Sequence, residues 1–201
     1  MDKTEKISRE GKNNKAETLF IRHTRLEELD CVMELYEKAR QFMAQCGNAS
    51  QWAGGYPERE LVMQDIHEQN SYVCLDDKGI VGVFYFAPGP DKTYEVITQG
   101  SWLNEEPYAV IHRIAIGEPG KGIAAFCYDW CMERCDNLRI DTHANNIAMQ
   151  RSLAKSGFIA CGIIYIGTGK DDQRIAYHKV KTATEIVASK QKNGKEDEQL
   201  T

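Results

Sequence analysis

The sequence predicts an α/β (α+β) fold in which a central mixed sheet is covered by helices on both faces. Two observations support this prediction. Nearly continuous apolar runs, which suit buried strands, alternate along the chain with stretches whose apolar residues recur at helical spacing. The chain of 201 residues is also 42% hydrophobic, which suffices to bury a full core, and one domain is expected at this length.

The first half of the chain predicts a strand, two helices and a hairpin. Thr24 and Glu27 have the spacing of a capping box, which opens a helix. Pro57 follows a linker with several glycines and suits the first position of a second helix. The expected elements are a strand at 18–24, a helix with Leu29, Val32, Met33, Tyr36 and Met43 on its buried face, a helix with Leu61, Val62 and Ile66, and strands at 72–75 and 80–87 joined by a turn at 76–79.

The second half predicts two strand–helix–strand units and a closing strand. The apolar run 108–116 is followed by a helical stripe that can cover it, formed by Ile123, Phe126, Cys127, Trp130 and Cys131. The remaining elements are strands at 138–142, 158–166 and 173–180 and a helix at 146–155. Residues 182–201 are mostly polar, so we expect a helix extension or a frayed tail there.

Charge and composition exclude several classes of protein. A net charge of −5 and a pI near 5.6 argue against a nucleic-acid surface, which needs a basic stripe. Residues 1–17 lack the apolar stretch of a signal peptide, and no run approaches the roughly 20 apolar residues of a membrane span. We therefore expect a cytoplasmic protein with neither a nucleic-acid partner nor a membrane partner.

Three of the cysteines could in principle form a metal site. Cys127, Cys131 and Cys135 share one helical face, but the sequence has neither a CxxC spacing nor a histidine close to them. Free cysteine is commonly buried as a small apolar residue. The seven cysteines are an odd number scattered along the chain, which fits reduced thiols in a reducing compartment. We expect core packing and no metal.

The most informative segment is the run 113–124, RIAIGEPGKGIA, in which a strand ends at three glycines and a helix begins. The N–H groups of a first helical turn have no partner inside the helix, so they can bind a phosphate together with the helix dipole. A side chain at Gly120 or Gly122 would block the approach of an anion. The expected anion-binding amides are those of Gly120, Lys121, Gly122, Ile123 and Ala124.

The spacing of the glycines decides among the phosphate-binding loops. A nucleotide-hydrolysing P-loop needs GxxxxGK followed by Ser or Thr, whereas Lys121 is followed by Gly122. The dinucleotide fingerprint GxGxxG is absent, and no acidic residue ends a second strand about 20 residues later. A site for the pyrophosphate of coenzyme A remains.

Two segments carry a resemblance to a known family. The run Lys121-Gly122-Ile123-Ala124 resembles motif A of the GNAT superfamily of acyl-CoA-dependent N-acyltransferases, although Pro119 stands where the family has Arg or Gln. Residues 139–158 are similar to motif B, in which an asparagine opens a helix and Lys-x-Gly-Phe leads into the next strand. The two motifs occur in the family's order, and the resemblance covers roughly residues 18–181.

The resemblance implies a GNAT domain at 18–181, between a polar N-terminal extension at 1–17 and a charged tail at 182–201. Its sheet would be mostly antiparallel, with about seven strands. Acetyl-CoA would be the co-substrate, and its pantetheine arm would lie along the backbone of residues 114–116, namely Ile114, Ala115 and Ile116. Asn146 would contact the cofactor, although either Asn145 or Asn146 could instead cap the helix. The family's usual proton-donating tyrosine is replaced by Leu153. Either Tyr165, Tyr108 or water supplies that proton, or the thiolate leaves without a proton donor.

The proton acceptor for an amine substrate has three candidates. His112 lies two residues before Ile114, so strand alternation predicts that both side chains share one face and that Arg113 points to the other. A neutral imidazole near pH 7 suits removal of an ammonium proton, which makes His112 the leading candidate. Its alternative role is that of a hydrogen-bonded core residue. Asp141 and His143 share a face of the neighbouring strand and form the second choice.

The acceptor is expected to enter between the linker at 45–56 and the long stretch at 88–107. A connection of that length inside a compact domain is usually functional or disordered. The two segments supply aromatic residues that either form pocket walls or anchor the loops to the core. The predicted substrate residues are Trp52, Tyr56, Tyr94, Trp102 and an acid, Glu95, which could orient a cationic amine or lie in solvent.

The combined prediction is an N-acetyltransferase that moves an acetyl group from acetyl-CoA to a primary amine of a small molecule or amino-acid-like acceptor. Direct attack in a ternary complex would be the mechanism. The alternative is a catalytically silent acyl-CoA-binding sensor or interaction protein of the same fold, which the absent family tyrosine favours. The sequence leaves the oligomeric state open, with a homodimer as one option.

Overall fold

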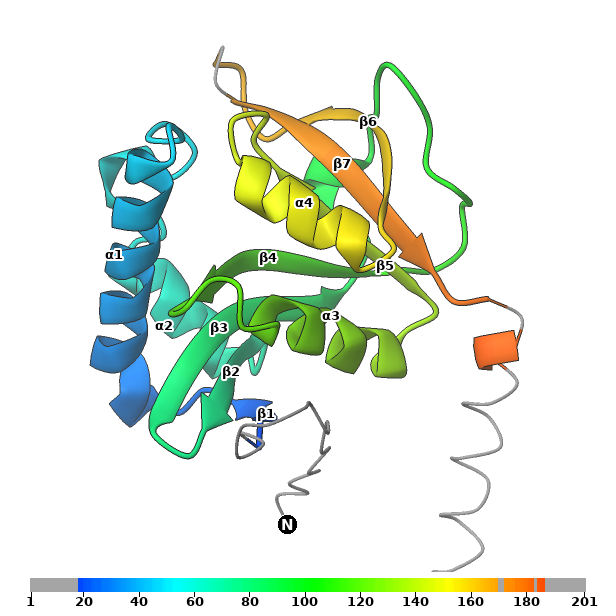
Figure 1. The fold of residues 1–201 in the computed structure, drawn as a ribbon. Coiled ribbons are helices and arrows are strands. Elements are labelled where there is room, and N and C mark those ends of the chain that lie inside the picture. The colour runs from blue at the N-terminus through cyan, green and yellow to red at the C-terminus, as the bar shows by residue number, and fades with distance from the viewer. Residues whose placement is uncertain (1–17, 170–171, 183, 187–201) are drawn as a thin grey trace, which may run out of the picture.

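A computed structural model describes residues 18–169, 172–182 and 184–186 (Figure 1). The N-terminal extension at 1–17 and most of the tail at 182–201 lie outside these residues. Three short 3-10 turns accompany the main elements, at Leu26–Glu28, Ala53–Gly55 and Lys92–Tyr94. The helices and strands are β1 (Phe20–His23), α1 (Leu29–Gln45), α2 (Arg59–His67), β2 (Ser71–Asp76), β3 (Gly79–Pro88), β4 (Ala109–Ile116), α3 (Ile123–Arg134), β5 (Asn137–Thr142), α4 (Ile147–Lys155), β6 (Ile159–Tyr165) and β7 (Gln173–Val180).

The strands form one sheet in the order β1-β2-β3-β4-β5-β7-β6. Every neighbouring pair is antiparallel except β4 and β5, which are parallel. The parallel pair arises because α3 connects the two strands as a crossover, which parallel strands require. The prediction of a mixed, mostly antiparallel sheet of seven strands is confirmed.

Helices cover both faces of this sheet (Figure 1). On one face α3 and α4 bury the largest apolar cluster, which includes Trp130, Phe126 and the fully buried Cys127 and Cys131. On the other face α1 and α2 pack over β2, β3 and the end of β4. Among the described residues, no helix has the length and apolar character needed to cross a membrane.

Two predicted helix starts differ from the structure. Thr24 does not open α1, because its buried hydroxyl hydrogen-bonds Ser71 at 2.7 Å across the sheet. The carboxylate of Glu28 instead accepts from the backbone N–H of Arg25 at 2.9 Å. This pair lies one residue after the predicted pair of Thr24 and Glu27. The second helix begins at Arg59 rather than at Pro57. Its N-cap is Glu58, whose backbone is still extended.

One extra residue interrupts the pairing of β4 with β3. Tyr85 is opposite His112, whereas Val83 is opposite Ala115, so three steps along β4 correspond to two along β3. Arg113 lies in this bulge with a φ of 51°, in the left-handed region that non-glycine residues rarely adopt. The bulge therefore shifts the alternation of side chains along the rest of β4.

This shift corrects the predicted faces of β4. The His112 ring lies 5.8 Å from the Tyr85 ring, and the Arg113 guanidinium lies 4.5 Å from the same ring. His112 and Arg113 are therefore on the same side of the sheet. Ile114 packs instead with the apolar cluster under α3. Strict alternation predicted that His112 and Ile114 share one face and that Arg113 points to the other. This prediction is wrong because the bulge adds a residue to β4.

The parallel strands β4 and β5 separate beyond their first three pairs. Residues 109–111 pair with residues 138–140, and β4 then continues to Ile116 beside β3 alone. Within the described residues, the backbone of 114–116 has no strand partner on the β5 side. A fork therefore opens in the middle of the sheet.

Buried aromatic residues anchor the long loop between β3 and β4. The Trp102 indole N–H donates to the carbonyl of Tyr94 at 3.1 Å. The Arg139 guanidinium lies between two rings, 4.1 Å from that of Trp102 and 3.8 Å from that of Tyr108. Thr98 adds a bridge to Ile163 on the edge strand β6. The loop is thus held at several points along its length.

His178 of β7 completes this anchor. Its Nδ1 accepts from the N–H of Leu103 at 3.3 Å, and its side chain is fully buried. Burial, with a contribution from the Arg139 charge, lowers the pKa of His178 from 6.5 to about 4. The folded protein therefore holds this imidazole in its neutral form at a pH where an unfolded chain would bind a proton.

We predict that His178 makes the protein less stable in mild acid. Below about pH 6.5 the unfolded state binds a proton that the folded state does not, so the free energy of unfolding falls as the pH is lowered towards 4, by up to about 3 kcal/mol. Urea denaturation at several pH values measures this slope. His178→Asn keeps an acceptor for Leu103 but cannot titrate, so its slope should be shallower; an unchanged slope would contradict the prediction.

Candidate functional site

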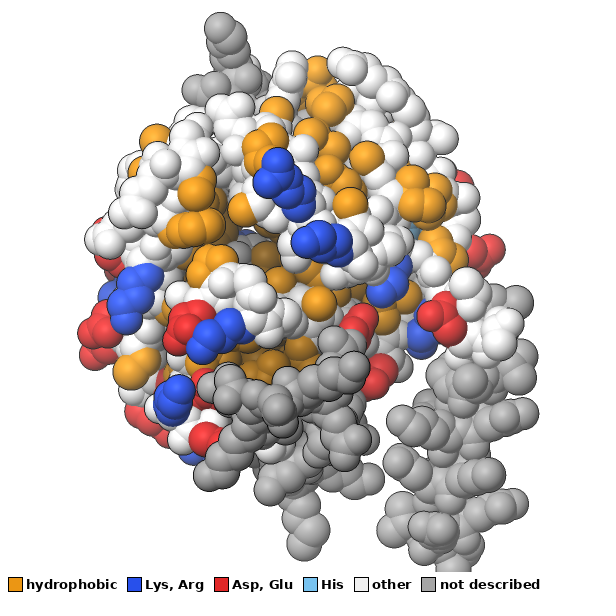
Figure 2. Space-filling view, in the orientation of Figure 1, with side chains coloured by type: hydrophobic (Ala, Val, Ile, Leu, Met, Phe, Trp, Pro, Cys, Tyr) orange, Lys and Arg blue, Asp and Glu red, His pale blue; other side chains and the backbone are white. Residues whose placement is uncertain are grey.

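A cavity of about 1150 Å³ lies at the fork between β4 and β5. Its walls come from the end of α1, the linker before α2, residues 111–116 of β4, the β4–α3 loop and α4. Figure 2 shows the surface hollowed between α1 and the helices α3 and α4, with hydrophobic side chains at the border of the hollow. The cavity therefore joins the glycine loop at one end to polar side chains of β4 and β5 at the other.

The glycine loop has the geometry expected of an anion cradle. Gly120 and Gly122 have φ values of 91° and 78°, which favour glycine, and a Cβ at either would meet no atom within 4 Å. The backbone hydrogen bonds of the loop run from Gly117 N–H to Val81 and from Phe126 N–H to Gly122. Within the described residues, the amides of 123–125 make no such bond. Residues 123–125 line the cavity at the N-terminus of α3.

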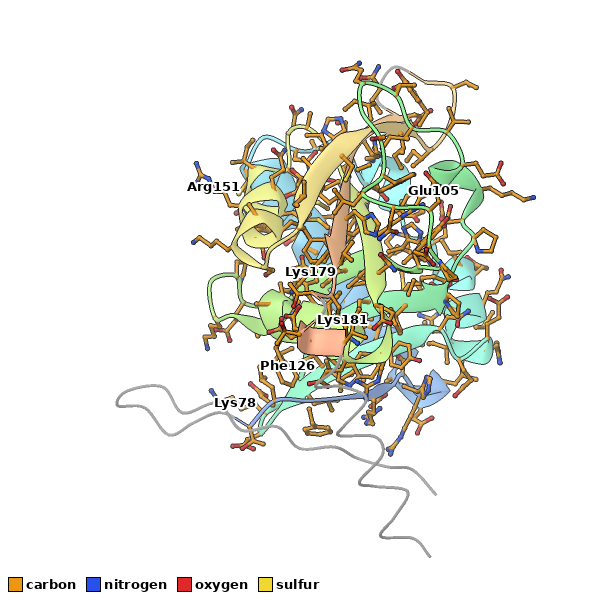
Figure 3. All side chains as sticks on the ribbon, turned by 90° about the vertical axis from the view of Figure 1, so that its right-hand side faces the viewer. Lys78, Glu105, Phe126, Arg151, Lys179 and Lys181 are labelled. Carbon is orange, nitrogen blue, oxygen red and sulfur yellow. The ribbon has the colours of Figure 1, made fainter. Side chains whose placement is uncertain are left out.

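Basic side chains lie around this end of the cavity. Lys121 pairs with Glu118 at 2.6 Å, and both side chains are exposed. Glu118 lines the cavity, whereas Lys121 itself is not among its wall residues. Arg151 and Lys155 of α4 do contribute to the wall. Figure 3 shows Arg151 extending outward from α4, on the opposite side of the molecule from Glu105 of the long loop.

The backbone of Ile114, Ala115 and Ile116 lies at the fork, and all three residues line the cavity. Ile123 and Ala124 continue this wall into α3. Since no strand in the described part of the chain pairs with residues 114–116 on the β5 side, their peptide groups on that edge can bind an extended ligand in the manner of a further strand.

At the other end of the cavity His112 lies between two carboxylates. Its Nε2 is 2.8 Å from Asp91 Oδ2, and its Nδ1 is 3.7 Å from Asp141 Oδ1. Tyr94 donates its hydroxyl proton to Asp141 Oδ1 at 2.7 Å. Arg174 of β7 approaches the other Asp141 oxygen at 4.0 Å. His112, Asp91 and Asp141 all line the cavity.

Asp91 is a site residue that the sequence reasoning missed. Its Oδ1 accepts from the backbone N–H of Thr93 at 2.8 Å and from the Thr93 hydroxyl at 2.6 Å. The hydrogen bond from His112, together with these bonds, holds the pKa of Asp91 well below its usual range. The Asp-x-Thr spacing signals a local turn. Nothing in the sequence indicated that this turn would reach His112, 21 residues away.

Arg113 forms a buried ion pair beside the cavity. Its guanidinium makes two hydrogen bonds to Asp65 of α2, at 3.0 Å and 2.8 Å. The guanidinium also donates to the Tyr56 hydroxyl at 3.4 Å. The pair ties β4 to α2 at the position of the bulge.

Asn146 caps α4 and lines the cavity. Its side-chain oxygen accepts from the backbone N–H of Met149 at 3.2 Å, which is the N-cap interaction considered from the sequence. Its amide group donates to Gln51 of the linker at 3.0 Å. Gln51 also accepts from the amide of Asn48 at 2.8 Å. This amide chain joins the start of α4 to the linker that follows α1.

The predicted substrate residues divide into two groups. Trp52 and Tyr56 line the cavity. Tyr94 and Trp102 are buried in the loop anchor, and Glu95 is exposed to solvent. None of these last three is a wall residue, so the alternative reading of the aromatic residues as loop anchors holds for Tyr94 and Trp102. Tyr94 still affects the site indirectly, because its hydroxyl binds Asp141.

His143 lies apart from the cavity. It follows the end of β5 and is buried, and its Nδ1 accepts from the backbone N–H of Asn145 at 3.1 Å. Its backbone carbonyl accepts from Gln150 at 3.3 Å. The ring therefore takes part in the turn that leads into α4. Asp141, the other second-choice base, is in contact with the cavity.

The tyrosines available as proton donors also differ from expectation. Leu153 is fully buried in the core, Tyr165 is exposed, and Tyr108 accepts from the backbone N–H of Asp91 at 3.1 Å. Tyr128 of α3, which the sequence reasoning missed, lines the cavity and hydrogen-bonds Ser152. Burial raises the pKa of Tyr128, so its hydroxyl stays protonated.

Comparison with known proteins identifies the family. No family model matches the chain, and no curated protein matches it. Among solved structures, a GNAT-family acetyltransferase from Streptococcus agalactiae is 32% identical, with a TM-score of 0.75, and the match covers 82% of this chain and 96% of that one. The chain therefore belongs to the GNAT family of acetyltransferases.

More distant structures share the fold alone. A ribosomal-protein-alanine N-acetyltransferase from Brucella melitensis is 17% identical, with a TM-score of 0.57, over 80% of this chain and 99% of that one. A protein from Salmonella typhimurium, solved with its cofactor acetyl-CoA, is 12% identical, with a TM-score of 0.57, over 82% of this chain and 95% of that one. At such identities the likeness concerns the arrangement of the elements.

We predict that the Arg113–Asp65 pair contributes strongly to stability. Asp65→Asn leaves a buried guanidinium without its countercharge, which should lower the free energy of unfolding by roughly 3–5 kcal/mol in urea denaturation. Asp30→Asn is the matched control, because the Asp30–Arg59 pair at 2.7 Å is exposed. Its loss should cost about 1 kcal/mol or less. Equal costs for the two variants would contradict the prediction.

Proposed function

We propose that the protein transfers an acetyl group from acetyl-CoA to a primary amine of a small molecule or amino-acid-like acceptor. One observation carries the proposal: a single cavity connects the start of α3, where the amides of 123–125 make no backbone hydrogen bond within the described residues, through the fork in the sheet, to His112. The family supports the transfer of an acetyl group. The acceptor and the catalytic roles of the residues are part of the proposal.

The loop fits the pyrophosphate of coenzyme A on two counts. Its glycines leave open space where side chains would stand, and the amides at the start of α3 lack protein partners among the described residues. The free edge of residues 114–116 would hold the pantetheine arm, and Arg151 and Lys155 add positive charge at the entrance. Asn146 is already engaged as a cap, so it would contact the cofactor from a fixed position.

Within this proposal His112 is the proton acceptor. Acetyl-CoA supplies an activated acetyl group as a thioester. The acceptor enters as an ammonium ion and gives one proton to His112. Its nitrogen then forms a C–N bond to the acetyl carbon as the C–S bond breaks. The sulfur gains a proton from Tyr128 or from water, and the second amine proton passes to the tyrosinate or hydroxide that this transfer leaves. The products are therefore an amide, a thiol and a protonated histidine.

The charges at this end of the cavity suit a cationic acceptor. Asp91 and Asp141 are the carboxylates nearest to His112. An ammonium ion would be attracted to this region before it loses its proton. The nearby Arg113 does not oppose this attraction, since Asp65 binds it with two hydrogen bonds.

The alternative is a silent acyl-CoA-binding protein. Leu153 favours this alternative, because it occupies the place of the family's proton-donating tyrosine and is buried. Release of free thiol from acetyl-CoA, measured against a broad panel of amines, separates the two functions. Tight binding of coenzyme A without thiol release on any amine would favour the silent protein.

We predict that Gly122→Ala weakens coenzyme A binding specifically. Both Gly122 and Gly47 have left-handed φ values, 78° and 82°, and both would place a Cβ in open space. Alanine at either position should therefore cost about 1 kcal/mol of stability through backbone strain. The Gly122 methyl group alone would stand in the path of the pyrophosphate. Calorimetry should show an affinity about tenfold lower for Gly122→Ala and unchanged for Gly47→Ala; equal affinities would refute the cradle.

We predict that His112→Gln reduces turnover and leaves cofactor binding intact. Removal of a general base lowers kcat by about 100-fold or more. The coenzyme A affinity, measured by calorimetry, should stay unchanged, because the glycine loop and the free edge of β4 are untouched. A parallel loss of turnover and affinity would instead assign His112 a structural role.

A further inference from the structure

The two contacts of the His112 ring differ in kind. The 2.8 Å separation between Nε2 and Asp91 is a hydrogen bond. The 3.7 Å separation between Nδ1 and Asp141 is too long to be one. The two nitrogens of a neutral imidazole are distinct, because one carries the proton and the other accepts. The geometry therefore bears on which nitrogen can act as a base.

Asp91 can act only as a hydrogen-bond acceptor towards His112. Its Oδ1 is occupied by the backbone N–H and the hydroxyl of Thr93, which leaves Oδ2 turned to the ring. An ionised carboxylate has no proton to donate, and the low pKa of Asp91 keeps it ionised. The hydrogen bond between Oδ2 and Nε2 therefore requires that Nε2 carries the proton.

We propose that Asp91 is a positioning residue that keeps the proton of neutral His112 on Nε2, so that Nδ1 is the atom that receives the proton of the acceptor amine. This inference rests on the proposed function for its catalytic consequence. The assignment of the proton itself depends only on the Asp91–His112–Thr93 geometry. It gives the long loop a direct role in the site, since Asp91 and Thr93 both belong to that loop.

The opposite side of the ring suits an incoming ammonium ion. Asp141 is held by the Tyr94 hydroxyl, which donates to the oxygen that faces Nδ1. An acceptor N–H group can donate to this carboxylate while another points to the lone pair of Nδ1. After proton transfer, the new Nδ1–H faces the same carboxylate. The charged or titratable groups around the ring are Asp91, Tyr94, Asp141, Tyr85, Arg113, Asp65 and, beside Asp141, Arg174.

The first test reads the proton position directly. The chain has five histidines, so nitrogen-15 labelling of histidine gives few ring signals, and His112→Gln assigns those of His112. The spectra are recorded up to alkaline pH, where the neutral ring carries a single proton, and in the wild-type protein that proton should lie on Nε2. A neutral ring with its proton on Nδ1 would overturn the inference. This measurement needs no acetyl transfer.

The second test exchanges the carboxylate for an amide. In Asp91→Asn the side-chain oxygen stays with the Thr93 N–H, so the amide NH₂ faces Nε2 and donates to it. The ring should then carry its proton on Nδ1, and the nitrogen spectrum should show the exchange. Asp91→Ala removes the hydrogen-bond acceptor at Nε2 and adds no donor there, so it favours neither position of the ring proton. A ring that keeps its proton on Nε2 in Asp91→Asn would overturn the inference.

Turnover should follow the proton position. We expect Asp91→Asn to lower kcat by about 100-fold or more, and Asp91→Ala to lower it less, with the affinity for coenzyme A unchanged in both. Glu106→Gln removes an exposed charge from the same loop and should leave kcat unchanged. A larger loss in the alanine variant would contradict the tautomer assignment. If wild-type protein transfers no acetyl group while the spectra behave as expected, the proposed function fails and the assignment of the proton stands.

Discussion

The left-handed backbone of Arg113 is the constraint on which the site depends. Such a conformation costs a non-glycine residue about 1–2 kcal/mol, and the two hydrogen bonds to Asp65 offset that cost. The extra residue bends β4 and turns His112 and Arg113 to the same side of the sheet. Beyond it β4 no longer runs with β5, and the cavity forms in the opening. The ion pair thus ties β4 to α2 beside the space in which the proposed chemistry takes place.

The cavity has a direction because its two ends differ in charge. At one end, backbone amides and the basic residues of α4 can bind an anion. At the other end, Asp91 and Asp141 flank His112 and would repel one. A long substrate with a phosphate at one end therefore has one favoured orientation. An amine acceptor, as proposed above, would be attracted to the end that the phosphate avoids, so that donor and acceptor would meet at the fork.

The sequence predicted the fold well because the signals involved are local. Apolar periodicity located the strands and helices, and glycine spacing located the loop at the N-terminus of α3. The predicted faces of β4 were wrong, since a bulge at an arginine has no signature in residue spacing. Asp91 was missed for a different reason. Its turn with Thr93 is readable, but its approach to His112 depends on how a loop of nearly 20 residues folds back over the sheet.

The same loop shows which role its aromatic residues take. The sequence left two roles open for Tyr94 and Trp102, pocket wall or loop anchor, and in the structure both pack into the core and hold the loop in place. Arg139 of β5 contacts the rings of Trp102 and Tyr108 and so holds the C-terminal end of the loop. With both ends anchored, Asp91 has its position before any substrate binds. Carboxylates that are already in place would need no rearrangement when a proposed amine acceptor arrives. The acceptor end of the site is therefore preorganised and does not depend on closure around the substrate.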